Sequence, residues 1–169
     1  MDADIALRPV QTTDLAFLCR FYREPELVAT NWYGYRDLGS LERRYNADGY
    51  LGAEDGRLIV TVDDQPAGFV DWSPAGHGAG KYRSIGIALV PEQRGRGVGT
   101  HAQRLLCRYL FAHTAIQRIE AATLPDNIAE QRALDRIGFT REGLLRSAEF
   151  IEGEYRDVVV YGLLRDDQR

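Results

Sequence analysis

The chain has 169 residues, a length that supports one domain built around a single core. Hydrophobic residues make up 44% and charged residues 27%, so the chain is expected to fold without a disulfide or a structural metal. The formal net charge is −4, which excludes a broadly basic surface and with it general nucleic-acid binding. We therefore expect one globular domain over residues 1–169 that has no nucleic-acid partner.

The cysteines and the apolar runs predict where the protein works. Cys19 and Cys107 lie in apolar patterns typical of helices and match neither a disulfide framework nor a metal-ligand cluster. The three histidines have no partners at metal-ligand spacing, so no metal is expected. The longest apolar run, residues 85–90, is far too short to cross a bilayer, and no basic-then-apolar leader follows Met1. These patterns predict a cytoplasmic protein in a reducing compartment, with no membrane partner.

The first half of the chain carries strand and helix patterns in turn. In chain order it predicts a strand at 5–9, a helix capped by 12–14, a short helix around Leu38, Leu41 and Tyr45, and strands at 57–63 and 67–72. The last two strands are rich in β-forming residues and flank a turn at 64–66, so we expect a hairpin.

The second half predicts a different arrangement, in which strands alternate with long helices. Its elements are a glycine-rich loop at 73–80, a strand at 82–90, a polar connection at 91–97, a helix at 100–112, a strand at 116–123, a helix capped by 125–127 and ended by Gly138, and strands at 146–150 and 157–164. An antiparallel beginning therefore leads into a central βαβ unit. The fold class expected is a mixed α/β sheet with one parallel pair in the middle and helices on both faces.

Glycine is concentrated at the centre of that unit. Seven of the 17 glycines lie between positions 76 and 99, and three of them alternate in residues 93–100 (QRGRGVGT), between a strand and a helix. Bare glycine backbone lets a ligand approach closely, and the first N–H groups of a helix are donors for an anion. A P-loop is excluded because no Gly-Lys-Ser/Thr ends the segment. The segment predicts a site for another phosphate-bearing ligand.

A dinucleotide is one candidate for that ligand. Residues 97–102 (GVGTHA) fit G-x-G-x-x-A, and Glu120 follows roughly 20 residues later at the end of the next strand. Two features weigh against it: residues 91–94 separate the motif from its strand, and too few residues follow Glu120 to complete a doubly wound sheet. An NAD(P)-dependent reductase is thus the weaker hypothesis.

Three motifs in order favour another ligand. Residues 94–99 (RGRGVG) fit R-x-x-G-x-G, and Asn127 precedes Gly138-Phe139 with ten residues between them. With the order of elements, this resembles the GNAT superfamily of N-acetyltransferases, and residues 142–146 and 155–164 resemble its RimJ/RimL branch. The resemblance implies a GNAT-like domain that moves an acetyl group from acetyl-CoA to a primary amine, either a peptide or protein N-terminus or a small molecule such as an amino sugar or antibiotic. Homodimers are common in this branch, so a homodimer is expected by analogy.

The resemblance also implies how the co-substrate is held. Main-chain groups of Ile87, Leu89 and Val90 would hold the pantetheine arm and the thioester carbonyl, where their strand splays from its neighbour at a bulge, and Asn127 would contact the arm. The pyrophosphate would accept from the amides of Gly95, Arg96, Gly97, Val98, Gly99 and Thr100. For the side chains of Arg94 and Arg96, contact with the phosphates and solvation at a loop tip both stay open.

The catalytic groups are less visible in the sequence. Where family members often carry a tyrosine seven or a serine three residues after the asparagine, this chain has Leu134 and Glu130, so no general acid is assigned. Asp71 and Glu120 are the candidate bases, and Asp71 is preferred because aspartate suits the middle of a strand poorly. If neither acid nor base exists, the chain would be a non-catalytic CoA-binding module.

Aromatic residues predict the acceptor pocket. Trp32, Tyr33 and Tyr35 cluster beside a glycine and would give flat apolar walls with hydrogen-bonding edges, whereas Tyr45 and Tyr50 are expected in the core. Both cysteines sit in apolar stripes, so neither is expected to carry an acyl group. We therefore expect direct attack of the amine on the thioester.

Overall fold

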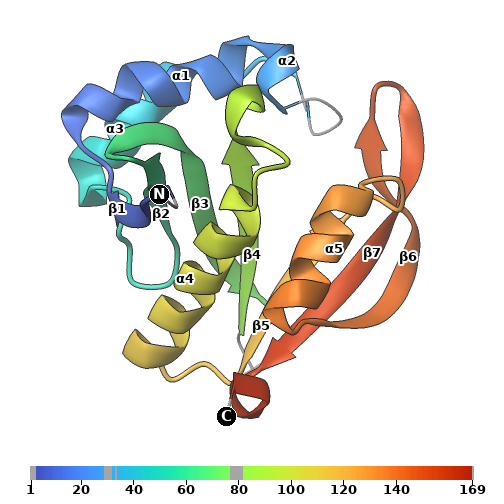
Figure 1. The fold of residues 1–169 in the computed structure, drawn as a ribbon. Helices are drawn as coiled ribbons and strands as arrows, with labels where there is room; N and C mark the ends of the chain where they lie inside the picture. The colour runs from blue at the N-terminus through green and yellow to red at the C-terminus, as the bar shows by residue number, and fades with distance from the viewer. Residues whose placement is uncertain (1–2, 29–31, 33, 77–81, 169) are drawn as a thin grey trace.

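The computed structural model describes residues 3–28, 32, 34–76 and 82–168. Within these ranges seven strands form one mixed sheet in the order β1-β2-β3-β4-β5-β7-β6 (Figure 1). The strands are β1 (Ile5–Pro9), β2 (Gly56–Val62), β3 (Gln65–Ala75), β4 (Tyr82–Leu89), β5 (Arg118–Thr123), β6 (Thr140–Ile151) and β7 (Glu154–Leu164). The α-helices are α1 (Leu15–Arg23), α2 (Pro25–Val28), α3 (Gly39–Asp48), α4 (Val98–His113) and α5 (Ile128–Ile137). The predicted mixed α/β class is confirmed.

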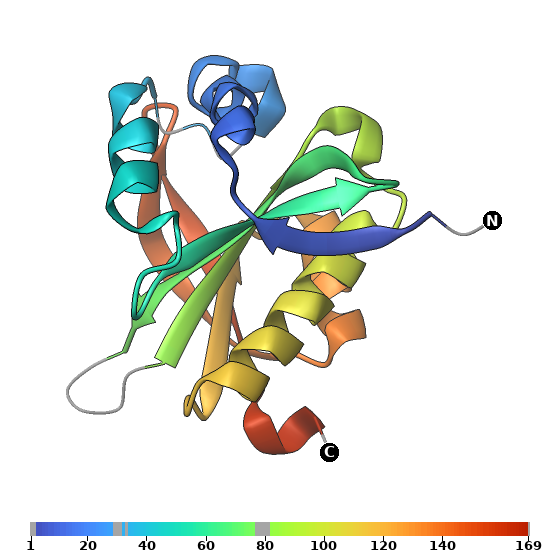
Figure 2. The same cartoon turned by 90° about the vertical axis from the view of Figure 1, so that its left-hand side faces the viewer.

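Helices cover both faces of the sheet, as predicted (Figure 2). Side chains of β2 alternate, so Leu58 and Val60 join the core beneath α4 and α5, whereas Ile59 joins the core beneath α1 and α3. The first core also contains Leu106, Leu110 and Leu134, and the second contains Leu18, Phe21 and Leu41. None of the described helices has both the length and the apolar character of a membrane span.

Tyr45 and Tyr50 belong to the second core, as predicted. Tyr50 is buried and its hydroxyl donates to the carbonyl of Leu41 over 3.0 Å. Burial raises the pKa of Tyr50 to about 12. Its phenol therefore stays protonated and serves as a fixed donor inside the core.

The start of α1 is held by an ion pair with β1. The carboxylate of Asp14 accepts from Arg8 through Nη1 at 2.6 Å and Nη2 at 2.8 Å, and it also accepts from the amide of Gln11 at 2.7 Å. The hydrogen bond from Arg8 is the largest cause that lowers the pKa of Asp14, against the opposing effect of burial. Asp14 thus fixes the helix that walls one side of the site described below.

The predicted turn at 64–66 is wrong. The hairpin turns at Asp63 and Asp64, with φ of 49° and 63°, and β3 begins at Gln65. A two-residue hairpin turn needs positive φ at both positions, and aspartate tolerates it better than most residues. Pro66 has no N–H for the ladder, and the register shifts beside it, between Val60 and Thr61.

Three strands, β3, β6 and β7, are longer than predicted, and one α-helix was not predicted. Strand β3 runs to Ala75, so the predicted loop at 73–80 begins later, and its residues 77–80 lie outside the described ranges. Strand β6 begins at Thr140 instead of 146, because nearly all its side chains are exposed and give no alternation to detect. Helix α2 has four residues, too few for a periodic signal.

Strands β4 and β5 form the predicted parallel pair, but only over a short stretch. Their ladder joins Arg83–Ile85 to Ile119–Ala121, whereas the ladder between β3 and β4 continues to Gly68 and Leu89. The second half of β4 therefore leaves β5. It does so without a register shift against β3, so the expected bulge is absent from this pairing.

Candidate functional site

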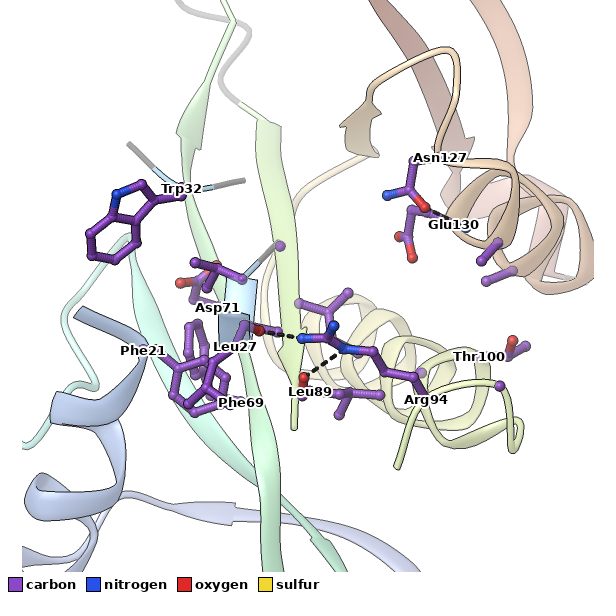
Figure 3. Close-up of a pocket in the computed structure, with 18 of the residues that line it drawn as sticks. Phe21, Leu27, Trp32, Phe69, Asp71, Leu89, Arg94, Thr100, Asn127 and Glu130 are labelled. Atoms are coloured by element: carbon purple, nitrogen blue, oxygen red, sulfur yellow. Dashed lines mark hydrogen bonds between the residues drawn. The ribbon is translucent and has the colours of Figure 1, made fainter. Parts of the chain in front are cut away.

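A cavity of about 810 Å³ opens where β4 leaves β5. Its walls come from α1 and α2, from β3 and β4, from the loop that precedes α4, and from α5 on the opposite side (Figure 3). It brings together ten of the predicted residues: Trp32, Asp71, Ile87, Leu89, Arg94, Gly95, Gly97, Gly99, Thr100 and Asn127. Tyr35, Val90, Arg96 and Val98 do not line it, and Tyr33 lies outside the described residues.

The free edge of β4 supplies main-chain groups to the cavity. Val90 donates its N–H to the carbonyl of Ala67 at 2.9 Å, so by antiparallel alternation Ala88 also turns its main-chain groups toward β3. Ile87 and Leu89 then turn theirs the other way, toward the space that β5 has left. An extended ligand with amide groups could pair along this edge.

Val90 does not share that role. Its N–H is bonded to Ala67, and its carbonyl accepts from Gln93 at 3.0 Å, so both of its main-chain groups are used. Its side chain is buried in the core beneath α1. Main-chain groups of successive residues point to opposite edges of a strand, so those of Val90 point toward β3 and those of Ile87 and Leu89 point away from it. The sequence motif does not show this difference.

The loop before α4 forms an anion cradle. Gly95 and Gly97 have φ of 70° and 81°, with open space where a Cβ would stand, so glycine is required there by conformation rather than by crowding. Gly97 is the N-cap, and the first helical bond of α4 runs from His101 to its carbonyl. The amides of the first turn have no helical acceptor and are donors for an anion.

The other residues of the segment differ in what they can offer. Val98 is buried in the core, so only its amide is available, and Arg96 is exposed away from the cavity. Gly99 has ordinary backbone geometry, and a Cβ there would meet Leu89 Cδ1 at 3.6 Å and Ile87 Cδ1 at 3.7 Å. The three alternating glycines therefore do not share one structural reason.

Arg94 is exposed, and its side chain lines the cavity and is anchored by two main-chain carbonyls (Figure 3). Its Nε donates to the carbonyl of Leu89 at 3.0 Å, and its Nη2 donates to the carbonyl of Leu27 in α2. Both acceptors are neutral, so the guanidinium keeps its full positive charge in the cavity. The residue ties α2 to β4 and adds a cation beside the cradle.

Asp71 lies in the middle of β3 and faces the cavity. Its Oδ2 accepts from Nη2 of Arg57 at 2.9 Å, and its side chain is 35% exposed. Arg57, which the sequence did not single out, also stacks on the ring of Phe69 at 4.0 Å. Burial is the largest influence and lowers the pKa of Arg57, but the charges and hydrogen bonds of Asp71 and Tyr22 together outweigh it, so the pKa lies above its usual value. This cross-strand ion pair explains an aspartate in mid-strand.

Gly86 has no side chain and so leaves space for the Asp71 carboxylate. It is the register partner of Asp71, and a Cβ at position 86 would lie 2.7 Å from Asp71 Oδ1. Trp32 and Tyr22 complete the apolar side of this end of the cavity. Tyr35 packs edge-on against Trp32 but is 83% exposed.

Helix α5 forms the opposite wall. Asn127 is its N-cap, and its side chain accepts from the amide of Glu130 at 3.3 Å. Glu130 lines the cavity, whereas Leu134 is fully buried in the core and cannot act as an acid. Glu120 lies elsewhere, between Tyr82 and Arg118, and does not line the cavity.

The cysteines and possible metal ligands add nothing to this site. Burial raises the pKa of Cys107 to about 12, so its thiol is not a nucleophile, and neither Cys107 nor Cys19 lines the cavity. Across the described ranges there is no group of three or more His, Cys, Asp or Glu side chains placed to hold a metal.

Comparison with known proteins identifies the family. The family model for the Acetyltransferase (GNAT) domain matches residues 4–140. The probable N-acetyltransferase YjcK of Bacillus subtilis (strain 168) is 34% identical over 110 residues, which are 65% of this chain and 61% of that protein. The Vibrio cholerae spermidine N-acetyltransferase in complex with CoA and spermine has a TM-score of 0.85 at 21% identity, covering 96% of both chains. RimL, a ribosomal L7/L12 α-N-protein acetyltransferase in complex with coenzyme A, has a TM-score of 0.81 at 20% identity, covering 96% of this chain and 95% of that one.

At these identities the two solved structures show the likeness of fold. A reductase with a dinucleotide site is the wrong hypothesis, because a doubly wound sheet needs several parallel pairs and the described strands form one. The family match covers the cavity, its glycine cradle and the free edge of β4. The chain therefore belongs to the GNAT family of acetyl-CoA-dependent N-acetyltransferases.

Proposed function

We propose that the chain acetylates a primary amine which enters beside Trp32 and Asp71, by direct attack on acetyl-CoA held along β4. One observation carries this proposal. The cavity joins an unpaired strand edge and an anion cradle at one end to a carboxylate and aromatic side chains at the other. Acetyl-CoA supplies the activated acetyl group, and the chain supplies binding, orientation and proton transfer.

The cradle and the strand edge fit that co-substrate. Amides before and within the first turn of α4 would bind the pyrophosphate, and Arg94 would add a positive charge beside it. The main-chain groups of Ile87 would pair with the amides of the arm, and the N–H of Leu89, whose carbonyl accepts from Arg94, would donate to the thioester carbonyl. Asn127 would contact the arm from α5.

The acceptor proposed is an α-amine, at a peptide N-terminus or on a small molecule. Arg57 holds the Asp71 carboxylate at the cavity wall, where it can orient an ammonium group and take one proton. Deprotonation at pH 7 costs about 4.6 kcal/mol for a lysine-like amine but only about 1 kcal/mol for an α-amine. RimL is named for an α-amine and the Vibrio enzyme for spermidine, so both acceptor types need a direct comparison.

The test is release of free thiol from acetyl-CoA across a panel of peptide N-termini, spermidine and amino sugars. We expect the highest kcat/KM with an α-amine. CoA binding without thiol release from any amine would instead identify a non-catalytic CoA-binding module. A panel in which spermidine alone reacts would overturn the acceptor class and leave the acetyl transfer standing.

A homodimer and a cytoplasmic location complete the proposal. The homodimer rests on analogy with the RimJ/RimL branch, and the location rests on the sparse, unpaired cysteines. Analytical ultracentrifugation checks the first, since a mass near that of one chain contradicts it. Fluorescence microscopy of a tagged chain in its own host checks the second.

A further inference from the structure

Two carboxyl groups line the cavity from different walls and in contrasting surroundings (Figure 3). Asp71 projects from β3 and is paired with Arg57, whereas Glu130 projects from the first turn of α5 and has no ion-pair partner among the residues described. Asp126, a third carboxylate at the rim, is exposed and paired with Arg156. Two carboxyls of one cavity in different environments are suited to different proton-transfer roles.

Glu130 is held by a polar side chain inside the core. Its Oε2 accepts from Nε2 of Gln103 at 3.3 Å, and Gln103 on α4 is only 1% exposed. The Asn127 cap fixes the backbone of the same turn. A buried amide whose side-chain partner is one carboxyl group in a ligand cavity suggests a positioned functional group rather than a solvated surface charge.

Charged side chains of both signs line the cavity around Glu130, and arginines outnumber aspartates. Arg36 lines it from the segment before α3, Arg57, Asp71 and Arg94 from β2, β3 and the loop before α4, and Asp126, Arg132 and Arg136 from α5 and the turn before it. Among the described residues, Arg57 is paired with Asp71 and Asp126 with Arg156, and Glu130 forms no ion pair with Arg57, Arg94, Arg132 or Arg136. Burial is the largest influence and raises the pKa of Glu130, while the hydrogen bond from Gln103 lowers it in part. The carboxyl therefore holds its proton to a higher pH than an ordinary glutamate.

Resting on the proposed acetyl transfer, we propose that Glu130 is a catalytic residue that protonates the departing sulfur of CoA, and that Gln103 is its positioning residue. The amine nitrogen forms a bond to the carbonyl carbon, and the carbon–sulfur bond breaks. Glu130 passes its proton to the sulfur, so CoA leaves as a thiol. The nitrogen gives up its surplus proton to Asp71 and then to water, and water reprotonates Glu130, so the products are one amide and one thiol.

The position of Glu130 suits this step. Ile87 and Leu89 follow Gly86, the register partner of Asp71, along the free edge of β4, so a thioester held at Leu89 lies between the wall that carries Asp71 and the first turn of α5. The acceptor amine would approach from the Asp71 side, and the sulfur would leave toward Glu130. A positioned general acid contributes roughly 100- to 10,000-fold to a rate.

The experiment compares Glu130→Gln, Glu130→Asp and Gln103→Leu, with Asp135→Asn as control. Asp135 is an exposed carboxylate on the same helix and does not line the cavity. We expect Glu130→Gln to lower kcat about 100-fold with KM for acetyl-CoA changed less than twofold, and to abolish the fall in activity at high pH that the acid imposes. Glu130→Asp should keep that fall with a reduced kcat, and Asp135→Asn should match the parent chain.

Gln103→Leu gives a second, independent readout. Because the Gln103 bond lowers the pKa of Glu130, its loss should raise that pKa and move the high-pH fall upward. Carbon-13 NMR titration of the glutamate carboxyls in the free protein should show one signal, absent in Glu130→Gln, that titrates above the usual range and moves further up in Gln103→Leu. A Glu130 signal at the ordinary glutamate value would overturn the proposal without any assay.

The outcomes distinguish a failure of the Glu130 role from a failure of the proposed acetyl transfer. If the parent chain releases no thiol with any amine, acetyl transfer fails. If the parent chain is active and a folded Glu130→Gln variant keeps its kcat within twofold, only the role of Glu130 fails. Thermal unfolding and CoA affinity of each variant establish folding before the rates are compared.

Discussion

The two ends of the cavity are built from different parts of the chain. The proposed cofactor end consists mainly of main-chain groups, namely the free edge of β4 and the first amides of α4, which depend on backbone conformation. The acceptor end consists of side chains from α1, β2 and β3, which depend on ion pairs and aromatic contacts. Backbone sites tolerate changes in pH and in neighbouring side chains, whereas side-chain sites can be retuned by one substitution. With this arrangement, substitutions at the acceptor end can change which amine binds while the main-chain groups that bind acetyl-CoA stay the same.

Among the substitutions that separate the two ends, the largest effect is expected from one that disrupts the acceptor end alone. Arg57→Leu leaves the Asp71 carboxylate without its partner, a loss that costs about 2 kcal/mol once partial exposure is considered. We expect kcat/KM for the amine to fall about 30-fold, measured by thiol release, and the Kd for CoA to change less than twofold by calorimetry.

Arg57→Lys is the matched control, because it keeps the charge and loses the planar stacking on Phe69. It should retain more activity than Arg57→Leu. An equal loss of CoA affinity in both variants would show that the two ends are not separate.

A smaller effect is expected when the cofactor end is changed. Gly97→Ala places a Cβ on a residue with φ of 81°, which costs about 1–2 kcal/mol even though the space is open. Calorimetry should show CoA binding about 10-fold weaker, since the first amides of α4 shift with their cap.

The same substitution at Gly99 is the control. Its φ is ordinary and its new Cβ would make only van der Waals contacts. CoA affinity should therefore stay within threefold, with stability unchanged or slightly raised by the better helix former. Equal losses at positions 97 and 99 would mean that space, rather than conformation, selects glycine in the cradle.

The smallest effect concerns pH. The pKa of Asp14 is lower in the folded state than in the unfolded chain, so its pairing with Arg8 stabilises the protein above the unfolded pKa near 4 and is lost as pH falls through the folded pKa. Urea unfolding of the parent chain should thus lose about 1 kcal/mol more than Asp14→Asn between pH 6 and pH 3. Parallel pH curves for the two proteins would rule out this role of the pair at the base of α1.

The sequence predicts the cofactor end well because its signals are local. The pattern at 94–99 and the Asn127 to Gly138 spacing each lie within one loop or one helix, and the structure places Gly95, Gly97 and Asn127 at the cavity. Strand alternation, which places Ile87 and Leu89 but not Val90 at the free edge, depends on pairing with a second strand. The sequence motif contains no information on that pairing.

The acceptor end could not be predicted to the same depth because it depends on register between distant strands. A turn at 64–66 would have placed Asp63 opposite Ala67 and hence Asp71 opposite Ile59. The two-residue turn at 63–64 and the shift beside Pro66 place Asp71 opposite Arg57 instead. The sequence names Glu130 at the position where relatives often carry a serine but gives no reason to assign it as an acid, since its partner Gln103 lies 27 residues away on another helix.

The close contact between Gly86 and Asp71 means that the residue at one of these positions restricts the residue at the other. A side chain at 86 would occupy the place of the Asp71 carboxylate, so the sheet accommodates an acid on one of these strands at a time. An evolving or engineered enzyme that moved the acid from β3 to β4 would need a small residue at 71 in the same step or before it. The Asp71–Gly86 pair therefore has room for one carboxylate side chain, on β3 or on β4 but not on both.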